Sequence, residues 1–251
     1  MIKTGVVSAT FRKNSPEQVL DLVIKAGLDG IEWSSDVHIL PGDIKKAEKI
    51  KELCQEEGKE ICGYATYYRL GESQNPEMSF RPIIETAEAL RSPLIRIWAG
   101  NISSKEVSER AFLKMAEEAK TLVTMAKQIQ SKISFEYHRN TLADSCTGVQ
   151  NLLGAIPGSQ THWQHSESCS IEENERTIGE LLPFITTIHV QHCRNRVYYP
   201  LITGEEMWLR YFHQLKKLIG DHYACLEFVK DGSEKQFLED ANTLRAFIAR
   251  G

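Results

Sequence analysis

Side chains that could bind a cation or move a proton recur at the ends of short apolar runs. The runs ISFEYH, THWQ, IHVQ and CLEF carry, in order, Glu136, Gln164, His189 and Glu227. Carboxylate, amide and imidazole groups are ligands for divalent cations, and a carboxylate can also act as a general acid or base. Buried carboxylates are rare unless they are paired or coordinated. The four residues are therefore candidates for one functional cluster, if the fold brings the ends of these runs together.

The chain alternates apolar or β-branched runs with amphipathic segments, a pattern typical of strand–helix units. Strands are predicted at residues 4–10, 30–33, 60–68, 93–100, 133–138, 160–164, 185–191 and 223–229. Helices are predicted after them at residues 15–29, 43–58, 80–92, 108–130, 147–158, 171–182, 204–220 and 233–249. Ser15 is the expected N-cap of the first helix, with Pro16 in its first turn.

Eight such units in 251 residues predict a (β/α)₈ TIM barrel that forms one domain over residues 1–251. An open doubly wound sheet would normally carry a glycine-rich loop after its first strand, but SATFRKNSP follows here. In a TIM barrel the active site lies at the C-terminal ends of the strands. The four candidate residues end neighbouring strands at that face, so the fold predicts that they converge.

Other polar residues occupy positions that should face the barrel interior. Glu32 and Arg96 are expected to form a buried ion pair, because either charge alone would be costly there. His162 lies two residues before Gln164, so we expect it in the same interior layer. His165 follows Gln164 directly and is expected in the loop or the outer wall of the barrel.

Composition limits the function classes. The chain is 41% hydrophobic and 25% charged, with a formal net charge of −4, so a nucleic-acid partner is disfavoured. No apolar run reaches the ~18 residues that a membrane span needs, and no signal peptide is recognisable, which favours a cytoplasmic protein without a membrane partner. The six cysteines form no CxxC pair, and we expect all of them to be reduced.

The segments ISFEYHRNT, IHVQH with PLITGEEMW, and LEFV resemble the xylose isomerase-like barrels known as sugar phosphate isomerases/epimerases. The resemblance runs from GLDGIEW to LEFV, which is nearly the whole chain. It implies one divalent ion (Mn, Mg, Co or Zn) bound by Glu136, His189 and Glu227. The family has an aspartate where this chain has Gln164. An amide oxygen can still coordinate a hard cation, but the lost charge predicts weaker binding.

The resemblance also implies the reaction, because Glu136 and Glu227 would serve as catalytic acid and base. The expected activity is metal-dependent isomerisation or epimerisation of a small sugar, sugar phosphate or polyol-derived ketone through an enediolate. Six residues near the strand ends or in the following loops are candidates for binding the carbohydrate: Trp33, Tyr67, Trp98, His138, Arg194 and Arg196.

Alternative functions stay open at this point. The same site would suit a dehydratase, and the glutamine at the aspartate position also fits a non-catalytic carbohydrate-binding barrel or pseudoenzyme. The apurinic endonuclease branch of the superfamily is disfavoured, because Trp33 and Tyr67 stand where that branch has histidines and HCRNR follows the seventh strand. The sequence leaves the oligomeric state open, including a homo-oligomer.

Overall fold

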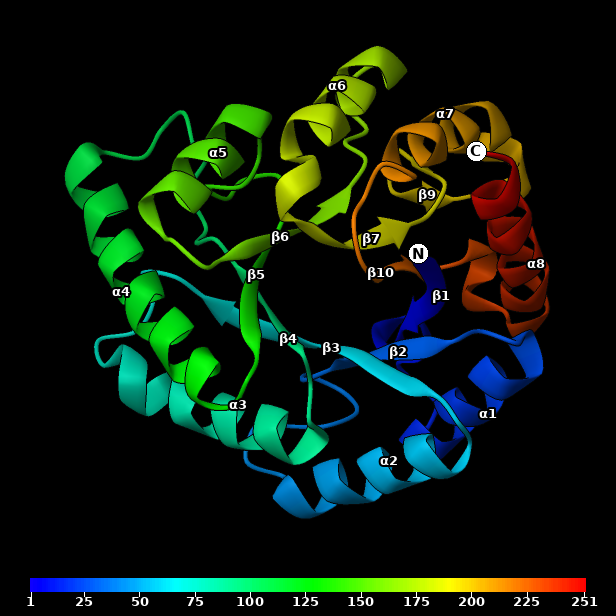
Figure 1. Ribbon diagram of the computed structural model, residues 1–251, viewed down its shortest axis with the longest axis horizontal. Helices are drawn as coiled ribbons and strands as arrows, with labels where there is room; N and C mark the ends of the chain where they lie inside the picture. Colours follow the sequence, from blue (N-terminus) through cyan, green and yellow to red (C-terminus); the bar gives the residue numbers. More distant parts are fainter.

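A ring of eight parallel strands organises the computed structural model, which describes residues 1–251. The strands close in the order β1-β10-β7-β6-β5-β4-β3-β2, and Figure 1 shows the helices arranged around them. The barrel strands are β1 (Ile2–Val7), β2 (Gly30–Ser34), β3 (Glu60–Arg69), β4 (Leu94–Trp98), β5 (Lys132–Glu136), β6 (Gln160–Gln164), β7 (Ile185–Val190) and β10 (His222–Leu226). The predicted (β/α)₈ barrel is confirmed.

One helix follows each barrel strand, as the sequence predicts. The helices are α1 (Pro16–Ala26), α2 (Ile44–Glu56), α3 (Pro76–Leu90), α4 (Glu109–Gln128), α5 (Cys146–Ala155), α6 (Ile171–Leu181), α7 (Glu205–Leu215) and α8 (Glu234–Arg250). At the start of α1 the Ser15 side chain accepts from Gln18 N, and the Gln18 side chain accepts from Ser15 N. This reciprocal capping satisfies donors that a helix start leaves free, and it fixes where α1 begins.

The first strand is shorter than its apolar pattern predicts. β1 ends at Val7, and Ser8–Phe11 form a short 3₁₀ helix, η1. Ser8 Oγ accepts a hydrogen bond from Ser34 N at 2.8 Å and lies 2.9 Å from His38 Nδ1. The Ser8 side chain thus takes over a contact to β2 that a longer strand would make through its backbone.

The loop after β7 contains an element that the sequence pattern does not predict. Cys193–Arg194 (β8) and Val197–Tyr198 (β9) pair as a two-stranded antiparallel hairpin. Each strand has only two residues, which is too short for an alternating pattern to be recognised. The hairpin lies at the C-terminal end of the barrel, close to the ends of β6 and β7 (Figure 1).

The main hydrophobic core fills the space between the strands and the surrounding helices. Its largest fully buried side chains include Trp33, Trp163 and Trp208. All six cysteines are free, as predicted; Cys62 and Cys225 come closest, with 3.7 Å between their Sγ atoms. The apolar core therefore lies mostly outside the ring, and the polar residues of the strands turn to its interior.

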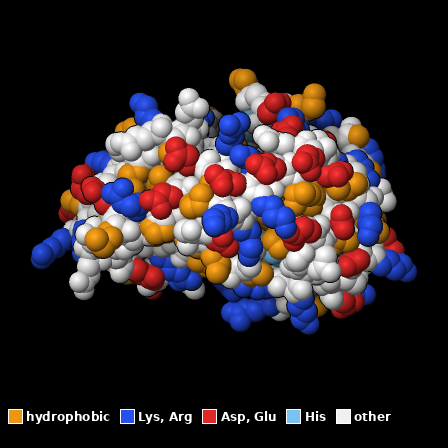
Figure 2. Space-filling view, turned by 90° about the horizontal axis from the view of Figure 1, so that it is seen from below, with side chains coloured by type: hydrophobic (Ala, Val, Ile, Leu, Met, Phe, Trp, Pro, Cys, Tyr) orange, Lys and Arg blue, Asp and Glu red, His pale blue; other side chains and the backbone are white.

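One face of the outer surface is mixed in charge. On the face seen in Figure 2, acidic and basic side chains alternate, with hydrophobic side chains between them. A protein that binds a nucleic-acid backbone concentrates lysine and arginine on one surface, and this face does not. None of the helices combines the length and the apolar character that crossing a bilayer requires.

Candidate active site

Three of the four predicted ligands converge where β5, β7 and β10 end. Glu136 is the last residue of β5, His189 lies near the end of β7, and Glu227 directly follows β10. One potential ligand atom of each lies within 4.8 Å of the others, and all three residues are buried. The convergence follows from the closed ring, because parallel strands end at one face and inward positions recur every second residue.

His189 is placed between two carboxylates. Its Nε2 lies 2.7 Å from Glu32 Oε2, and its Nδ1 lies 3.4 Å from Glu227 Oε2 without an aligned hydrogen bond. Burial alone would lower the pKa of His189, but the charges of Glu227 and Glu32 outweigh burial and raise this pKa well above its usual value. The imidazole therefore carries a proton when no cation lies beside it.

Glu32 holds this imidazole from the interior of the barrel. In addition to His189, its carboxylate lies 3.2 Å from His162 Nε2 and 3.9 Å from Arg96 Nε, and all of these side chains are almost completely buried. The predicted Glu32–Arg96 ion pair and the interior position of His162 are confirmed. A carboxylate on one ring nitrogen fixes the orientation of a histidine and leaves the other nitrogen for a ligand.

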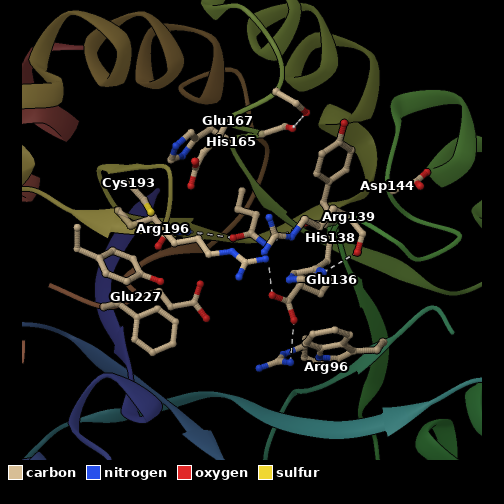
Figure 3. A pocket seen from close by; sticks show the side chains of 18 of the residues that line it. Arg96, Glu136, His138, Arg139, Asp144, His165, Glu167, Cys193, Arg196 and Glu227 are labelled. Carbon is tan, nitrogen blue, oxygen red and sulfur yellow. Dashed lines mark hydrogen bonds and ion pairs between the residues drawn. The ribbon is translucent and has the colours of Figure 1, made fainter. Parts of the chain in front are cut away.

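Arg96 makes its shorter contact with a different carboxylate. Its Nη1 lies 2.7 Å from Glu136 Oε2, and Figure 3 shows the guanidinium directly beside Glu136 at the base of the pocket. The sequence predicts an ion pair of Arg96 with Glu32 on β2 only. The strand order explains the difference, because β4 and β5 are neighbours in the ring whereas β3 separates β4 from β2.

Gln164 lies beside the three converging residues, with its nitrogen turned toward them. Its Nε2 lies 3.3 Å from Glu136 Oε1 and donates to the Tyr137 carbonyl at 2.9 Å, while its Oε1 accepts from Gln191 Nε2 at 3.2 Å. The amide oxygen, which is the atom able to coordinate a cation, is engaged by Gln191. In this arrangement Gln164 braces Glu136, and direct coordination would require the amide to turn.

The residues present fit a divalent cation. His189 Nδ1 is buried without an aligned hydrogen bond, and a buried polar atom of this kind needs a partner. Two carboxylates and an imidazole supply hard and borderline donors and two negative charges. Glu136, His189 and Glu227 would therefore hold the ion, and binding would release the proton from His189 Nδ1.

A cavity of about 470 Å³ opens above this cluster. Glu136 and Glu227 form part of its floor, and four of the predicted carbohydrate-binding residues line it: Tyr67, Trp98, His138 and Arg196. Trp98 lies between two of these, with ring centroids 6.2 Å from Tyr67 and 4.4 Å from His138. Such a wall of rings suits the apolar faces of a small polar molecule.

Two of the predicted carbohydrate-binding residues lie elsewhere. Trp33 is completely buried in the core and does not line the cavity, because Glu32 takes the inward position and the next residue on a strand faces outward. Arg194 lines a neighbouring cavity with His165 and His192. It stands on β8, where successive side chains also alternate, so it faces away from the pocket that Arg196 lines.

His165 lies in the loop directly after β6, as its place after Gln164 predicts, and it lines both the pocket and the neighbouring cavity. Its ring packs edge-on against Trp208, at a centroid distance of 5.8 Å. Burial lowers its pKa to about 4, so the imidazole is neutral. It belongs to neither group of residues that could hold a metal ion, and it packs between the barrel and α7.

The cavity also has lining residues that the sequence pattern does not single out. They include Arg139, Glu167, Tyr198 and Phe228. Arg139 could have been found, since it lies close to the strand-end residue Glu136. Phe228 has φ 56°, in the left-handed region that a bulky side chain rarely adopts. This backbone feature, directly after Glu227, has no sequence signal.

The fold and site can be compared with known proteins. By sequence, no curated protein matches the chain. By structure, the chain is similar to a probable 3-DHS dehydratase of petrobactin synthesis from Bacillus anthracis, with TM-score 0.81 and 16% identity over 98% of this chain and 99% of that one. A D-psicose 3-epimerase from Clostridium cellulolyticum H10, solved with D-tagatose, has TM-score 0.71 and 13% identity over 99% and 98%.

A third similar structure is the IOLI protein with a bound zinc atom, at TM-score 0.72 and 14% identity over 99% of this chain and 98% of that one. Identities this low establish the shared fold and leave activity to be argued from the site. The sequence itself identifies the family, because a family model matches most of the barrel. Residues 20–247 match the family described as xylose isomerase-like TIM barrel, and the chain belongs to that family.

Proposed function

We propose that the protein is a metal-dependent isomerase or epimerase of a small sugar or sugar-derived ketone. The observation that carries the proposal is the convergence of Glu136, His189 and Glu227 at the floor of an open pocket. Both carboxylates line the pocket, whereas His189 lies beneath it. A substrate in the pocket would therefore meet two groups able to move a proton.

Glu136 and Glu227 come from strands three places apart in the ring, β5 and β10, so they reach a substrate from different sides. One carboxylate would remove a proton from the carbon next to a carbonyl, leaving an enediolate. Return of a proton to the opposite face gives epimerisation, and its return to the neighbouring carbon gives isomerisation. A divalent ion held by the cluster would polarise the substrate carbonyl and stabilise the charge of the enediolate.

The surrounding residues support this use of the carboxylates. Arg96 and Gln164 hold Glu136 from two sides, and His189 lies beside Glu227. Burial tends to raise the pKa of Glu227, but His189 and Arg96 outweigh burial and lower it. Glu227 is therefore ionised at neutral pH and can accept a proton from the substrate.

Hydrogen exchange with solvent tests the proposal across many sugars at once. The full chain with Mn²⁺ is incubated in D₂O with a panel of ketoses and aldoses, and deuterium at the carbon next to the carbonyl is followed by NMR. We expect incorporation with at least one sugar, and a large loss with Glu227→Gln. The product then distinguishes epimerisation, isomerisation and dehydration.

Calorimetric titration with Mn²⁺ provides the second arm of the test. Binding of Mn²⁺ without exchange into any sugar would favour the alternative, a non-catalytic carbohydrate-binding barrel. Failure of both the wild type and Gln164→Asp to bind Mn²⁺ would show that the cluster is not a metal site, and the proposed function would be wrong.

A further inference from the structure

Two arginines without an acidic partner overhang the same pocket. Arg139, in the loop after β5, and Arg196, at the tip of the β8–β9 hairpin, both line the cavity and form no ion pair. In Figure 3 both side chains extend over the opening, on the side of Glu136 that faces away from Arg96. An unpaired arginine on an open surface is ordinary, but two from separate loops over one cavity are not.

The two loops face each other across this opening. Burial raises the pKa of Tyr198 to about 12, and the positive charge of Arg139 acts against that rise. Tyr198 belongs to the hairpin that carries Arg196, so the Arg139 guanidinium lies within electrostatic reach of the hairpin. Two like charges over one cavity repel each other, and an anion between them would remove that repulsion.

The backbone of the hairpin favours glycine where Arg196 stands. Asn195 and Arg196 have φ 52° and φ 63°, the positive values of a two-residue turn in which Asn-Gly is strongly preferred. A long side chain in this left-handed conformation costs roughly 1–2 kcal/mol. Arg196 therefore lowers the stability of the turn but places a guanidinium over the pocket. Backbone strain of this kind is often found at functional sites.

The acidic residues of the same walls already have other partners. Glu167 Oε2 accepts from Asn195 N at 2.8 Å, which ties the hairpin tip to the loop after β6. Asp144 Oδ1 accepts from Ser104 Oγ at 2.6 Å. Neither carboxylate forms an ion pair with Arg139 or Arg196, so both guanidiniums keep their donors for a ligand.

We propose that Arg139 and Arg196 bind an anionic group of the substrate, a carboxylate or a phosphate, at the rim of the pocket. The guanidinium fork matches either group with paired hydrogen bonds. The proposal rests on the proposed function, because it assigns the substrate class of the same pocket. With the anion at the rim and the carbonyl end at the acidic floor, the substrate can enter in only one direction.

Anion binding to the full chain tests the proposal. Inorganic phosphate, D-gluconate and neutral D-glucitol are titrated calorimetrically at low salt, with and without Mn²⁺. We expect phosphate or gluconate to bind in the absence of Mn²⁺, and D-glucitol to bind much more weakly. Arg139→Gln and Arg196→Gly should each weaken anion binding by about tenfold or more, as expected for a lost charged hydrogen bond.

Arg194→Gln is the matched control, since Arg194 lies in the same hairpin but lines the neighbouring cavity. It should leave anion binding unchanged. Arg196→Gly restores the preferred turn residue, so its melting temperature should equal or exceed that of the wild type. Preference for gluconate assigns a carboxylate substrate, and preference for phosphate assigns a phosphorylated one.

Equal anion affinity in the wild type, Arg139→Gln and Arg196→Gly would overturn the proposal, as would the absence of anion binding to the wild type. Equal weakening by Arg194→Gln would also overturn it, because it would indicate a general charge effect. If deuterium exchange into a neutral ketose proceeds while these titrations fail, the proposed function stands and only the anion site is wrong.

Discussion

The two ends of the barrel balance their charges differently. At the N-terminal end, Lys3 Nζ lies 2.7 Å from Glu60 Oε1, and the Tyr223 hydroxyl donates to the same carboxylate. At the C-terminal end, Glu32, Glu136 and Glu227 are all buried around one guanidinium and a histidine. At the first end, the carboxylate has a lysine as its partner. The second has three carboxylates against one guanidinium, and one negative charge stays uncompensated even when His189 carries a proton.

Under the proposed function, this difference separates an end that stabilises the fold from an end that binds. Charges buried without full compensation are costly, and they persist where they serve a function. The matched end contributes a modest ion pair near the surface. The unmatched end can be completed by a cation, which would take the place of the proton on His189. The division agrees with the general finding that the chemistry of TIM barrels lies at the C-terminal face.

The sharpest test of this contrast removes one carboxylate from each end. Glu227→Gln should lower turnover by roughly 10²–10⁴-fold, the usual contribution of a general acid or base, while the protein stays folded. Glu60→Gln is the matched control and should leave turnover unchanged. Steady-state kinetics with the sugar that shows deuterium exchange would measure both. Equal losses in the two variants would mean that the ends do not differ in the way proposed.

A smaller effect is expected from Glu32→Gln, which removes the charge behind His189. Outer partners of metal-binding histidines typically contribute 10–100-fold in metal affinity, so Mn²⁺ binding should weaken by roughly that factor. The substitution keeps an oxygen that can accept from Nε2. Calorimetric titration would measure the change. An unaltered affinity would show that Glu32 serves only the barrel interior and does not position His189.

The sequence predicts the barrel well because two periodicities determine it. Alternation along strands such as β5 and β7, and amphipathic spacing along the helices, follow from which side chains must be buried. The ligand positions then follow from the ring, since Glu136 and His189 are inward residues at strand ends. The same alternation also explains the error at Trp33, because the pattern of so short a strand does not decide which of the neighbours Glu32 and Trp33 faces inward.

The partners and loops could not be predicted in the same way. Contacts such as Arg96 with Glu136 depend on side-chain conformation, and several acidic residues lie within reach of one guanidinium. The β8–β9 hairpin and the left-handed Phe228 depend on contacts across the barrel mouth. Packing between distant segments sets these features, and no local pattern in the sequence records it.

Acidity should weaken the unmatched end selectively. The pKa of His189 is raised well above its usual value, and its Nδ1 must lose a proton before it can coordinate a cation. Below that pKa, Mn²⁺ affinity should therefore rise by about tenfold for each unit of pH and level off above it. Titrations in buffers with different ionisation enthalpies would also detect the released proton. An affinity independent of pH would exclude His189 as a ligand.

Restoring the family's aspartate at position 164 should add one negative charge to the C-terminal end. In Gln164→Asp a charged oxygen replaces an amide, and it attracts a cation more strongly. The shorter side chain gives up the hydrogen bonds from Gln164 to the Tyr137 carbonyl and to Glu136, so the gain in affinity should be modest. We expect Mn²⁺ to bind more tightly to Gln164→Asp than to the wild type, and more weakly to Glu227→Gln. Weaker Mn²⁺ binding to Gln164→Asp than to the wild type would indicate that the site requires the hydrogen bond from Gln164 to Glu136.

The smallest effect is expected at the matched end. Lys3→Met removes the cation but keeps an apolar stem, and Glu60 is half exposed with the Tyr223 hydroxyl still donating to it. A surface ion pair contributes about 0.2–1 kcal/mol, which in a protein of this size is a shift of at most about 4 °C in the melting temperature. The shift should shrink in 1 M salt, where charges are screened within about 3 Å. Mn²⁺ affinity should not change, because the substituted charge lies at the opposite end of the barrel from His189. A loss of affinity in Lys3→Met would show that the two ends are coupled, and the division between a stabilising end and a binding end would fail.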